Sequence, residues 1–584
     1  MQEGTDTDAD TGTEPGKNKG EARARGASAS ARATVETRLS RRFQVYMVVE
    51  GLLVGLAGGA VVTLYRMALS GAEGALRLAT EAVRQTPALV AIWVLAALLV
   101  CAIVSRLMLW EPNTQGSGIP QVDAEVMGSL DMPWHRVIAG KFVEGTLCCL
   151  GGLSLGREGP SVQLGAMAGK AVSRAIGRGR GEERLLVTCG AASGMSAAFN
   201  APLTGVLFAL EEIHREFSAP LLISVMAAAV SSDFLVSQVL GVQPVLQFVF
   251  AKDLPHGFYP YVIALGLFCG LAGVAHNRGM FACSERLFSR ISRHVPFARL
   301  AIPFALASVA AFAWPELTCG GDEIVRAIMR PGVMPIATVA ALLVGKYVLT
   351  TISFGSGAPG GTLFPLCVMG ALVGYLFADG ATLATGLPTE FIPNFLVLGI
   401  AGLFASVVRA PVTAVVLAFE LTGSLDALLS VSIVSIISYV TANLTQTDPF
   451  YEHLVGNLLD SIRKTKVFNA EKSDASGEKA LHTVTVGADS AVDGLTLADI
   501  DWPRGVRVVL VTRAGADITP TGDTRLMALD EVILMTDAAT DDDGFLRARQ
   551  MLAGSLDGGW EPRSSRIRAA LSVLASKSKG GDRS

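Results

Sequence analysis

Long apolar stretches, separated by short polar breaks, run from about residue 43 to residue 460. The first covers residues 43–69, and an unbroken apolar run follows at 88–104. A helix needs about 20 apolar residues to cross the hydrocarbon core of a membrane, but several later segments are interrupted by Gly and Pro, as at 151–160 and 355–365. Such interruptions are typical of half-helices that meet inside a membrane protein. The pattern therefore predicts an all-α polytopic membrane domain over residues 43–460.

The region before this domain is polar. Residues 1–42 contain no apolar core of a signal peptide, and their composition predicts a disordered arm. Basic residues flank the membrane region on both sides, with Arg41 and Arg42 before it and Arg463 and Lys464 after it. Because cytoplasmic loops carry an excess of Lys and Arg, we expect a protein of the cell membrane with both termini in the cytoplasm.

The polar region after the membrane domain has the pattern of a small α+β module. Short strand-like runs lie at 480–486, 507–513 and 531–537, with turn residues between them. We expect a cytoplasmic domain over residues 478–540. The remaining residues, 541–584, are charged and are expected to be disordered.

Composition supports the membrane assignment. The 584 residues are 51% hydrophobic and only 17% charged, whereas soluble domains carry about 25% charge. Lys and Arg number 48 against 52 Asp and Glu, so no basic excess indicates a nucleic-acid partner. The eight cysteines form no C-x-x-C pair, and we expect them to be small apolar packing residues; no metal site and no cofactor is predicted. The usage of Ala, Gly, Arg and Asp is typical of a bacterial protein.

An internal repeat divides the membrane region into two halves. The sequence FNAPLTGVLFALE at 199–211 has a counterpart, VRAPVTAVVLAFE, at 408–420, 209 positions later. The pattern G-x3-P-x4-G-x3-G at 156–169 recurs 205 positions later at 361–374. Repeats in transporters are often inverted, with the substrate site at their interface. We read the paired acids Glu211 and Glu420 at the ends of the first pair as structural.

Three glycine-rich segments are candidates for an anion site: GSGIP at 116–120, GREGP at 156–160 and GSGAPGG at 355–361. Glycines leave backbone N–H groups unobstructed, and Pro is tolerated in the first turn of a helix, so such segments can present helix N-termini to an anion. No cluster of Lys or Arg accompanies them, which favours a small monovalent anion that must leave again. The residues expected at one such helix N-terminus near the anion path are Gly156, Arg157, Gly159 and Pro160.

These motifs, together with FNAPLTGVLFALEE at 199–212, resemble the CLC family of chloride channels and chloride/proton exchangers over residues 43–460. The resemblance implies two inverted repeats with broken helices. It also implies a homodimer with one anion pathway per subunit and chloride ions and protons as the transported species.

The resemblance also implies an anion site built from four residues. Ser117 of GSGIP and Tyr451 of DPFYEHL would contact the central anion through their hydroxyls, and Thr362 and Leu363 through their backbone amides. The family usually has Phe where Leu363 stands here. The amide donor survives that difference, whereas the apolar lining of the pathway changes.

Two carboxylates complete the expected mechanism. By resemblance, Glu158 is the gating glutamate, which occupies an anion site when ionised, and Glu212 is the inner proton glutamate of exchangers. The expected function is antiport of two chlorides for one proton. A passive voltage-dependent chloride channel is the first alternative, although a channel has no need of Glu212. A secondary carrier of a small organic anion is the second, and the shortage of fixed cations disfavours it. An enzyme is disfavoured because the motifs include no nucleophile–base pair.

The tail has a resemblance of its own. The run from HTVTV at 482 to DEVILMT at 530 resembles the C-terminal subdomain of RCK/TrkA proteins, which implies a regulatory or dimer-contact role. It also implies a site for an unidentified small ligand.

Overall fold

The computed structural model separates into two compact units, Met1–Leu459 and Asp460–Ser584. Each unit is considered by itself. The structure describes the following residues: 17–215, 217–242, 250, 254–291, 295–329, 334–470, 479–487, 490, 492–513, 516–528, 530–537 and 542–553.

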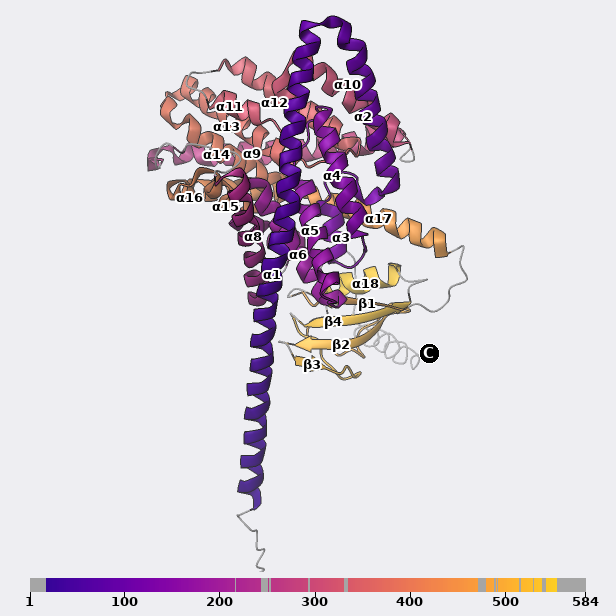
Figure 1. Ribbon diagram of the computed structural model, residues 1–584. Coiled ribbons are helices and arrows are strands. Elements are labelled where there is room, and N and C mark those ends of the chain that lie inside the picture. Colours follow the sequence, from indigo (N-terminus) through magenta and orange to yellow (C-terminus); the bar gives the residue numbers. More distant parts are fainter. Residues whose placement is uncertain are drawn as a thin grey trace, which may run out of the picture. The chain divides into compact units, whose positions relative to one another are not determined.

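The first unit is helical (Figure 1). Its first half contains α1 (Lys17–Gln85), α2 (Val90–Trp110), α3 (Ile119–Val126), α4 (Trp134–Leu150), α5 (Glu158–Ala175), α6 (Arg180–Phe199), α7 (Pro202–Phe208) and α8 (Ala219–Leu240). Its second half contains α9 (Tyr259–Ala282), α10 (Pro296–Ala313), α11 (Asp322–Ile328), α12 (Ile336–Gly355), α13 (Leu363–Thr385), α14 (Ile392–Val408), α15 (Pro411–Thr422) and α16 (Leu428–Leu444), and α17 (Phe450–Ala470) follows.

Short 3-10 and π segments join these helices. They are η1 (Pro87–Leu89), η2 (Pro112–Thr114), η3 (Ala209–His214), η4 (His256–Phe258), η5 (Cys283–Leu287), η6 (Phe288–Arg290), η7 (Pro315–Leu317), η8 (Thr389–Phe391) and η9 (Leu425–Ala427). Of these, η3 and η5 are π-helical. A π segment inside a helix is frequent at functional positions, and η3 contains one of the acids expected to act in proton transfer.

The two halves repeat each other. Helices α5 and α13 begin 205 positions apart and α7 and α15 begin 209 positions apart, as the sequence repeat predicts. In each half the helix that follows the glycine-rich turn packs along the next long helix, α5 on α6 and α13 on α14. The expected fold of two inverted repeats with broken helices is confirmed.

The repeats are joined by a reciprocal pair of helix caps. Glu211, at the end of the first repeat motif, accepts hydrogen bonds from Val412 N (3.2 Å) and Thr413 N (2.8 Å) at the start of α15. Glu420, its counterpart, accepts hydrogen bonds from Leu203 N (2.8 Å) and Thr204 N (2.7 Å) at the start of α7. Carboxylates are favourable there because the first N–H groups of a helix have no partner within it. The geometry supports a structural role for both acids.

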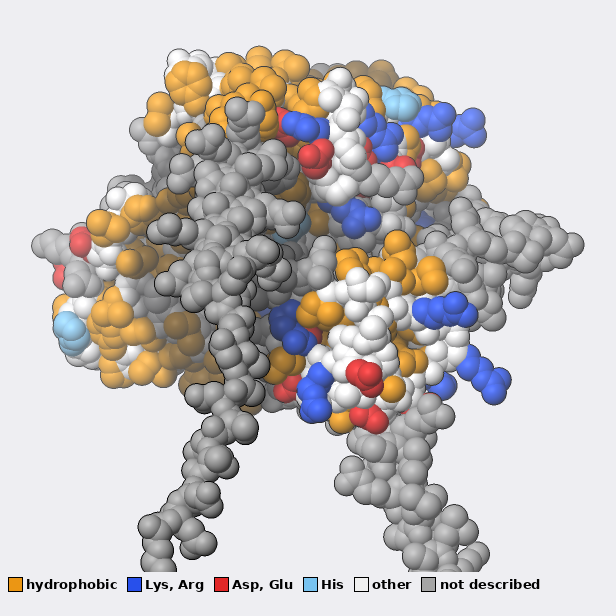
Figure 2. All heavy atoms as spheres, turned by 90° about the horizontal axis from the view of Figure 1, so that it is seen from below, with side chains coloured by type: hydrophobic (Ala, Val, Ile, Leu, Met, Phe, Trp, Pro, Cys, Tyr) orange, Lys and Arg blue, Asp and Glu red, His pale blue; other side chains and the backbone are white. Residues whose placement is uncertain are grey.

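The first unit has the helix lengths of a membrane protein. Within the described residues, nine helical stretches are long and apolar enough to cross a bilayer. The apolar windows of Leu363–Thr385 and Thr389–Val408 are 83% and 94% buried, whereas that of Pro87–Trp110 is only 17% buried. The first two therefore lie at the centre, and the outer helices present apolar side chains outward (Figure 2).

The N-terminal arm differs from the expectation. We expected disorder over residues 1–42, but α1 begins at Lys17 and continues through Gln85, so the expectation is wrong from residue 17 onward. Residues 17–42 are rich in Ala and Arg and contain no Pro, a composition with high helix propensity that continues directly into the apolar part of α1. Residues 1–16 lie outside the described residues.

The second unit contains a four-stranded antiparallel sheet in the order β1-β4-β2-β3. Its strands are β1 (Lys479–Thr485), β2 (Arg507–Arg513), β3 (Ala516–Ile518) and β4 (Glu531–Asp537). Three of them lie within one residue of the strands expected from the sequence. The sheet has its own apolar core, which includes Val484, Val511 and Leu534.

The expectation of disorder after residue 540 is wrong for α18 (Asp542–Ala553). Ala548, Met551 and Leu552 of this helix are buried in the core of the tail domain. Their spacing places them on one helix face, a signal that the neighbouring polar residues Arg547, Arg549 and Gln550 obscure. Residues 554–584 lie outside the described residues.

Candidate functional site

Backbone hydrogen bonds bring the three glycine-rich segments together. Gly116 N donates to Gly357 O at 3.1 Å, and Gly360 N donates to Gly116 O at 3.0 Å. Gly156 and Gly361, equivalent positions in the two repeats, form an antiparallel bridge with N···O distances of 2.7 and 2.8 Å. The starts of α3, α5 and α13 therefore meet at one place between the repeats, which is the arrangement expected of an anion site.

Glu158 lies at the centre of this meeting point. It is the first residue of α5, is 0% exposed, and its Oε1 accepts a hydrogen bond from Leu363 N at 2.5 Å. Leu363 is the first residue of α13 and occupies the position equivalent to Glu158 in the second repeat. Among the described residues, Oε2 of Glu158 has no hydrogen-bond partner. A carboxylate thus occupies the positive end of a facing helix.

Glycine is required where the two repeats approach the carboxylate. A Cβ atom on Gly156 would lie 2.2 Å from Glu158 Oε2, and one on Gly361 would lie 2.3 Å from Glu158 Oε1. A Cβ on Gly159 would lie 2.3 Å from Ser117 Oγ. Any side chain at these positions would displace the carboxylate or the hydroxyl from its place.

Hydroxyl groups converge on the same point. Ser117 is 2% exposed, and its Oγ has no hydrogen-bond partner within the described part of the chain. Tyr451, from the first turn of α17, is 1% exposed, and its phenol lies within interaction range of Ser117, Thr362 and Glu158. The residues expected to bind the anion are therefore brought together. A buried donor without a partner is costly in a protein interior, and a bound anion would provide its partner.

The residues around Glu158 fix the start of α5. Arg157 forms an ion pair with Asp322 at 3.4 Å, and its guanidinium lies 4.8 Å from the centre of the Phe364 ring. Pro160 lies in the first turn of α5 and is buried, where its missing N–H costs no helical hydrogen bond. Arg157 is thus engaged by neighbouring side chains and by an aromatic face.

Glu212 lies in a separate charged cluster. It is 6% exposed within η3, and its Oε1 is 3.8 Å from Nη2 of Arg215. Arg215 also contacts Asp123 at 3.4 Å and Glu452 at 3.3 Å. Both Glu158 and Glu212 lie within electrostatic range of Tyr451. Both acids therefore lie near Tyr451, one of the candidate anion ligands.

A family model described as voltage gated chloride channel matches residues 96–443. The H(+)/Cl(-) exchange transporter ClcA of Vibrio cholerae is 31% identical over 433 residues, which cover 70% of this chain and 88% of that transporter. The chain belongs to the voltage-gated chloride channel family. A second family member, ClcA of Cronobacter sakazakii, is 29% identical over 426 residues, with 70% of this chain and 88% of its own length covered.

Solved structures of family members share the fold. The structure of a slow cyanobacterial Cl-/H+ antiporter is 26% identical and superposes with a TM-score of 0.67, covering 71% of this chain and 98% of that one. A CLC-type fluoride/proton antiporter, 23% identical, has the same fold with a TM-score of 0.58 over 70% of this chain and 97% of that one. In the tail, a TrkA-C domain model matches residues 481–540, which confirms the second resemblance.

Two buried lysines belong to the site's framework although no motif singled them out. Lys141 Nζ donates to Thr114 O at 2.8 Å and Gly116 O at 2.6 Å. Lys346, 205 positions later, makes the equivalent contacts, with Cys319 O at 2.7 Å and a neighbouring carbonyl at 3.2 Å. Both are 0% exposed. Each lysine fixes the loop before a broken helix by hydrogen bonds to its carbonyl groups. The repeat spacing of 205 positions is the sequence signal that could have revealed this pair.

Proposed function

We propose that this chain exchanges chloride for protons across the cell membrane, two chlorides for one proton, as a transporter and not as an enzyme. The observation that carries the proposal is the position of Glu158, whose carboxylate accepts a hydrogen bond from the first amide of α13. A chloride ion requires the same N–H donors, so carboxylate and anion compete for one place. Protonation removes the charge of Glu158 and with it most of its advantage over chloride at that place.

The proposed central anion site combines backbone and hydroxyl donors. Thr362 and Leu363 contribute the amides at the start of α13, and Ser117 and Tyr451 contribute buried hydroxyls. All four are neutral donors, so the site can orient an anion without holding it too tightly to leave. The Leu side chain at position 363 leaves the amide donor unchanged.

The proposed proton path uses Glu212 as the inner acid. Exposure of the side chains rises along its cluster, from 8% for Glu212 through 35% for Arg215 to 52% for Glu452. Glu452 can therefore take up a proton from water at the exposed end of the cluster, and Arg215, which stays protonated, holds that carboxylate near Glu212. A passive channel needs no such acid, and this cluster favours exchange over the channel alternative.

The test uses purified protein in proteoliposomes, with chloride efflux and proton uptake recorded together. We expect Glu158→Gln and Glu212→Gln each to abolish chloride-driven proton uptake while chloride flux persists. Glu211→Gln is the matched control, because the neighbouring carboxylate caps α15 and should leave coupling intact. Proton uptake that survives in Glu212→Gln would contradict the role of that residue, and wild-type chloride flux without proton movement would favour the channel.

Further parts of the assignment follow the family resemblance. We propose that two copies of the chain form a homodimer with one pathway each, and that both termini face the cytoplasm. Native mass spectrometry of the purified protein tests the first, and protease protection in right-side-out vesicles tests the second. We also propose that the tail domain binds a small ligand, for which thermal shifts against a metabolite panel are the test.

A further inference from the structure

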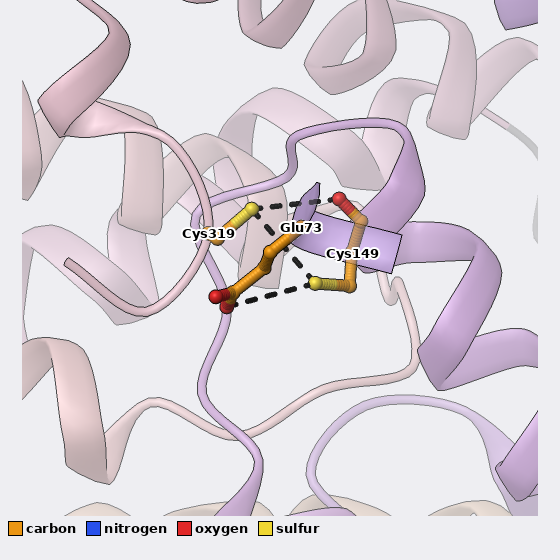
Figure 3. A group of neighbouring side chains, drawn as sticks. All are labelled: Glu73, Cys149 and Cys319. Atoms are coloured by element: carbon orange, nitrogen blue, oxygen red, sulfur yellow. Dashed lines mark hydrogen bonds between the residues drawn. The ribbon is translucent and has the colours of Figure 1, made fainter. Parts of the chain in front are cut away.

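Two thiols and a carboxylate from three distant parts of the chain come together beside the site (Figure 3). Glu73 belongs to α1, Cys149 to the last turn of α4, and Cys319 to the loop between η7 and α11. Cys149 Sγ lies 3.8 Å from Cys319 Sγ and 3.9 Å from Glu73 Oε1. One atom from each side chain lies within 4.8 Å of the other two. The sequence separations resemble no metal motif, so the sequence alone predicts only packing roles for both cysteines.

The spacing of these atoms is that of metal ligands. Two thiolates bound tetrahedrally to one zinc ion at about 2.3 Å are about 3.8 Å apart, and a thiolate and a carboxylate oxygen are about 3.5 Å apart. The observed separations are 3.8 and 3.9 Å. In a disulfide the two sulfur atoms are about 2.05 Å apart, so these two atoms would have to move much closer to each other. The separations therefore suit ligands of one cation, and in the absence of a metal Cys319 Sγ also donates a hydrogen bond to Cys149 O at 3.4 Å (Figure 3).

The backbone at Cys319 has an uncommon conformation. Its φ angle is +53°, in the left-handed region that a residue with a Cβ atom adopts only at a cost. Gly320 and Gly321, which could adopt this conformation freely, follow immediately. A cysteine at this position is thus conformationally unfavourable, and a ligand role for its thiol would account for it.

Two cavities adjoin the cluster. A cavity of about 210 Å³ is lined by Glu73, Cys319 and Asp322 among others. A smaller one, of about 30 Å³, is lined by Glu73 and Cys149 and extends to Gly156 and Arg157. An ion can therefore enter, and water can fill a fourth coordination position. The cluster also lies beside the turn that precedes Glu158.

We propose that Glu73, Cys149 and Cys319 bind one Zn²⁺ ion per chain, with water as the fourth ligand. Two thiolates and a carboxylate suit a borderline-soft divalent cation and exclude Mg²⁺ and Ca²⁺, which prefer oxygen ligands. Binding replaces the two thiol protons by Zn–S bonds and releases those protons to solvent, with no change of oxidation state. The ion would tie α1, α4 and the loop before α11 to one another.

The test measures metal bound to the full-length protein in detergent, reduced and then freed of reductant and chelator. We expect one equivalent of Zn²⁺ per chain by elemental analysis, and Co²⁺ in its place should give the thiolate-to-cobalt absorption and intense visible bands of a tetrahedral site. Both signals should be lost in Cys149→Ser and Cys319→Ser. Glu73→Gln should weaken binding by ~10-fold or more, since even losing an outer-shell partner has that effect.

Cys283→Ser is the matched control, because Cys283 is a partly exposed cysteine outside the cluster and should bind metal as the wild type does. Melting curves of the metal-free variants establish that each is folded before its binding is scored. Substoichiometric zinc in the wild type, or full binding in a folded Cys149→Ser or Cys319→Ser protein, would overturn the proposal. So would a disulfide between Cys149 and Cys319 found by peptide mapping of the protein purified without reductant.

Discussion

Replacing Glu211 by Gln should lower the thermal stability of the protein and leave proton coupling intact. Glu212→Gln, in contrast, should abolish proton coupling and leave the thermal stability unchanged. The two acids are adjacent in the sequence, but their surroundings differ. Glu211 accepts bonds from Val412 N, Thr413 N and Thr413 Oγ1 at 3.2, 2.8 and 2.7 Å. Glu212 Oε1, in contrast, has no hydrogen-bond partner among the described residues.

The size of the stability loss follows from the three bonds to Glu211. Removing a helix cap costs about 1 kcal/mol, and a hydrogen bond to a charged group contributes about 1.5–3 kcal/mol. Gln keeps one acceptor oxygen, but its amide NH2 group would face one of the N–H or O–H donors that now bond the carboxylate. We therefore expect the free energy of unfolding to fall by about 2–3 kcal/mol. The entropy of unfolding is about 2.1 cal/mol/K per residue. For the unit Met1–Leu459 the melting temperature should therefore fall by about 2–3 °C.

The assay pairs a melting curve in detergent with the coupled flux measurement in proteoliposomes. Glu420→Gln serves as the symmetric control, because Glu420 makes the same three types of bond to Leu203 and Thr204. Its melting temperature should fall by a similar amount. A Glu211→Gln protein that melts at the same temperature as the wild type and loses proton uptake would refute the structural role of Glu211.

Three further changes have defined outcomes. Gly361→Ala should weaken chloride binding in calorimetry by ~10-fold or more, because the new Cβ would lie 2.3 Å from Glu158 Oε1; Gly380→Ala, with open space around it, should bind normally. Ser117→Ala should weaken chloride binding by about 3–10-fold, the loss of one hydrogen bond, whereas Ser173→Ala, buried in α5, should not. Arg513 holds the pKa of Asp530 below its usual range. The stability from that pair is thus present above the unfolded pKa of about 3.9 and is lost as the pH falls through the lower folded pKa. Hydrogen exchange in β4 should show this loss in the wild type and not in Asp530→Asn.

Local pattern predicted most of the framework and the meeting of the glycine-rich segments. The repeat spacing already paired Gly156 with Gly361, and the structure joins them by two backbone hydrogen bonds. The strands of the tail were predictable because alternation of apolar and polar residues depends only on near neighbours. Each of these features depends on residues that lie close together in the sequence, and the internal repeat shows the motifs of the membrane region twice.

Contacts between distant segments could not be predicted in the same way. Cys149 and Cys319 are 170 positions apart, and nothing near either residue indicates its partner. The exchange of caps between Glu211 and Glu420 likewise depends on how the repeats dock. The helices at the two ends, α1 before residue 43 and α18, were missed because a charged composition was taken for disorder although helix propensity and spacing pointed the other way.

The coupling of chloride to protons can be measured with the wild-type protein alone. Wild-type protein is reconstituted into vesicles loaded with high chloride and diluted into low chloride, with the membrane potential clamped at zero by a K⁺ ionophore and equal K⁺ on both sides. We expect chloride efflux to drive protons into the vesicles against a pH gradient, with one proton entering for every two chlorides that leave. Chloride efflux with no proton uptake would contradict this expectation.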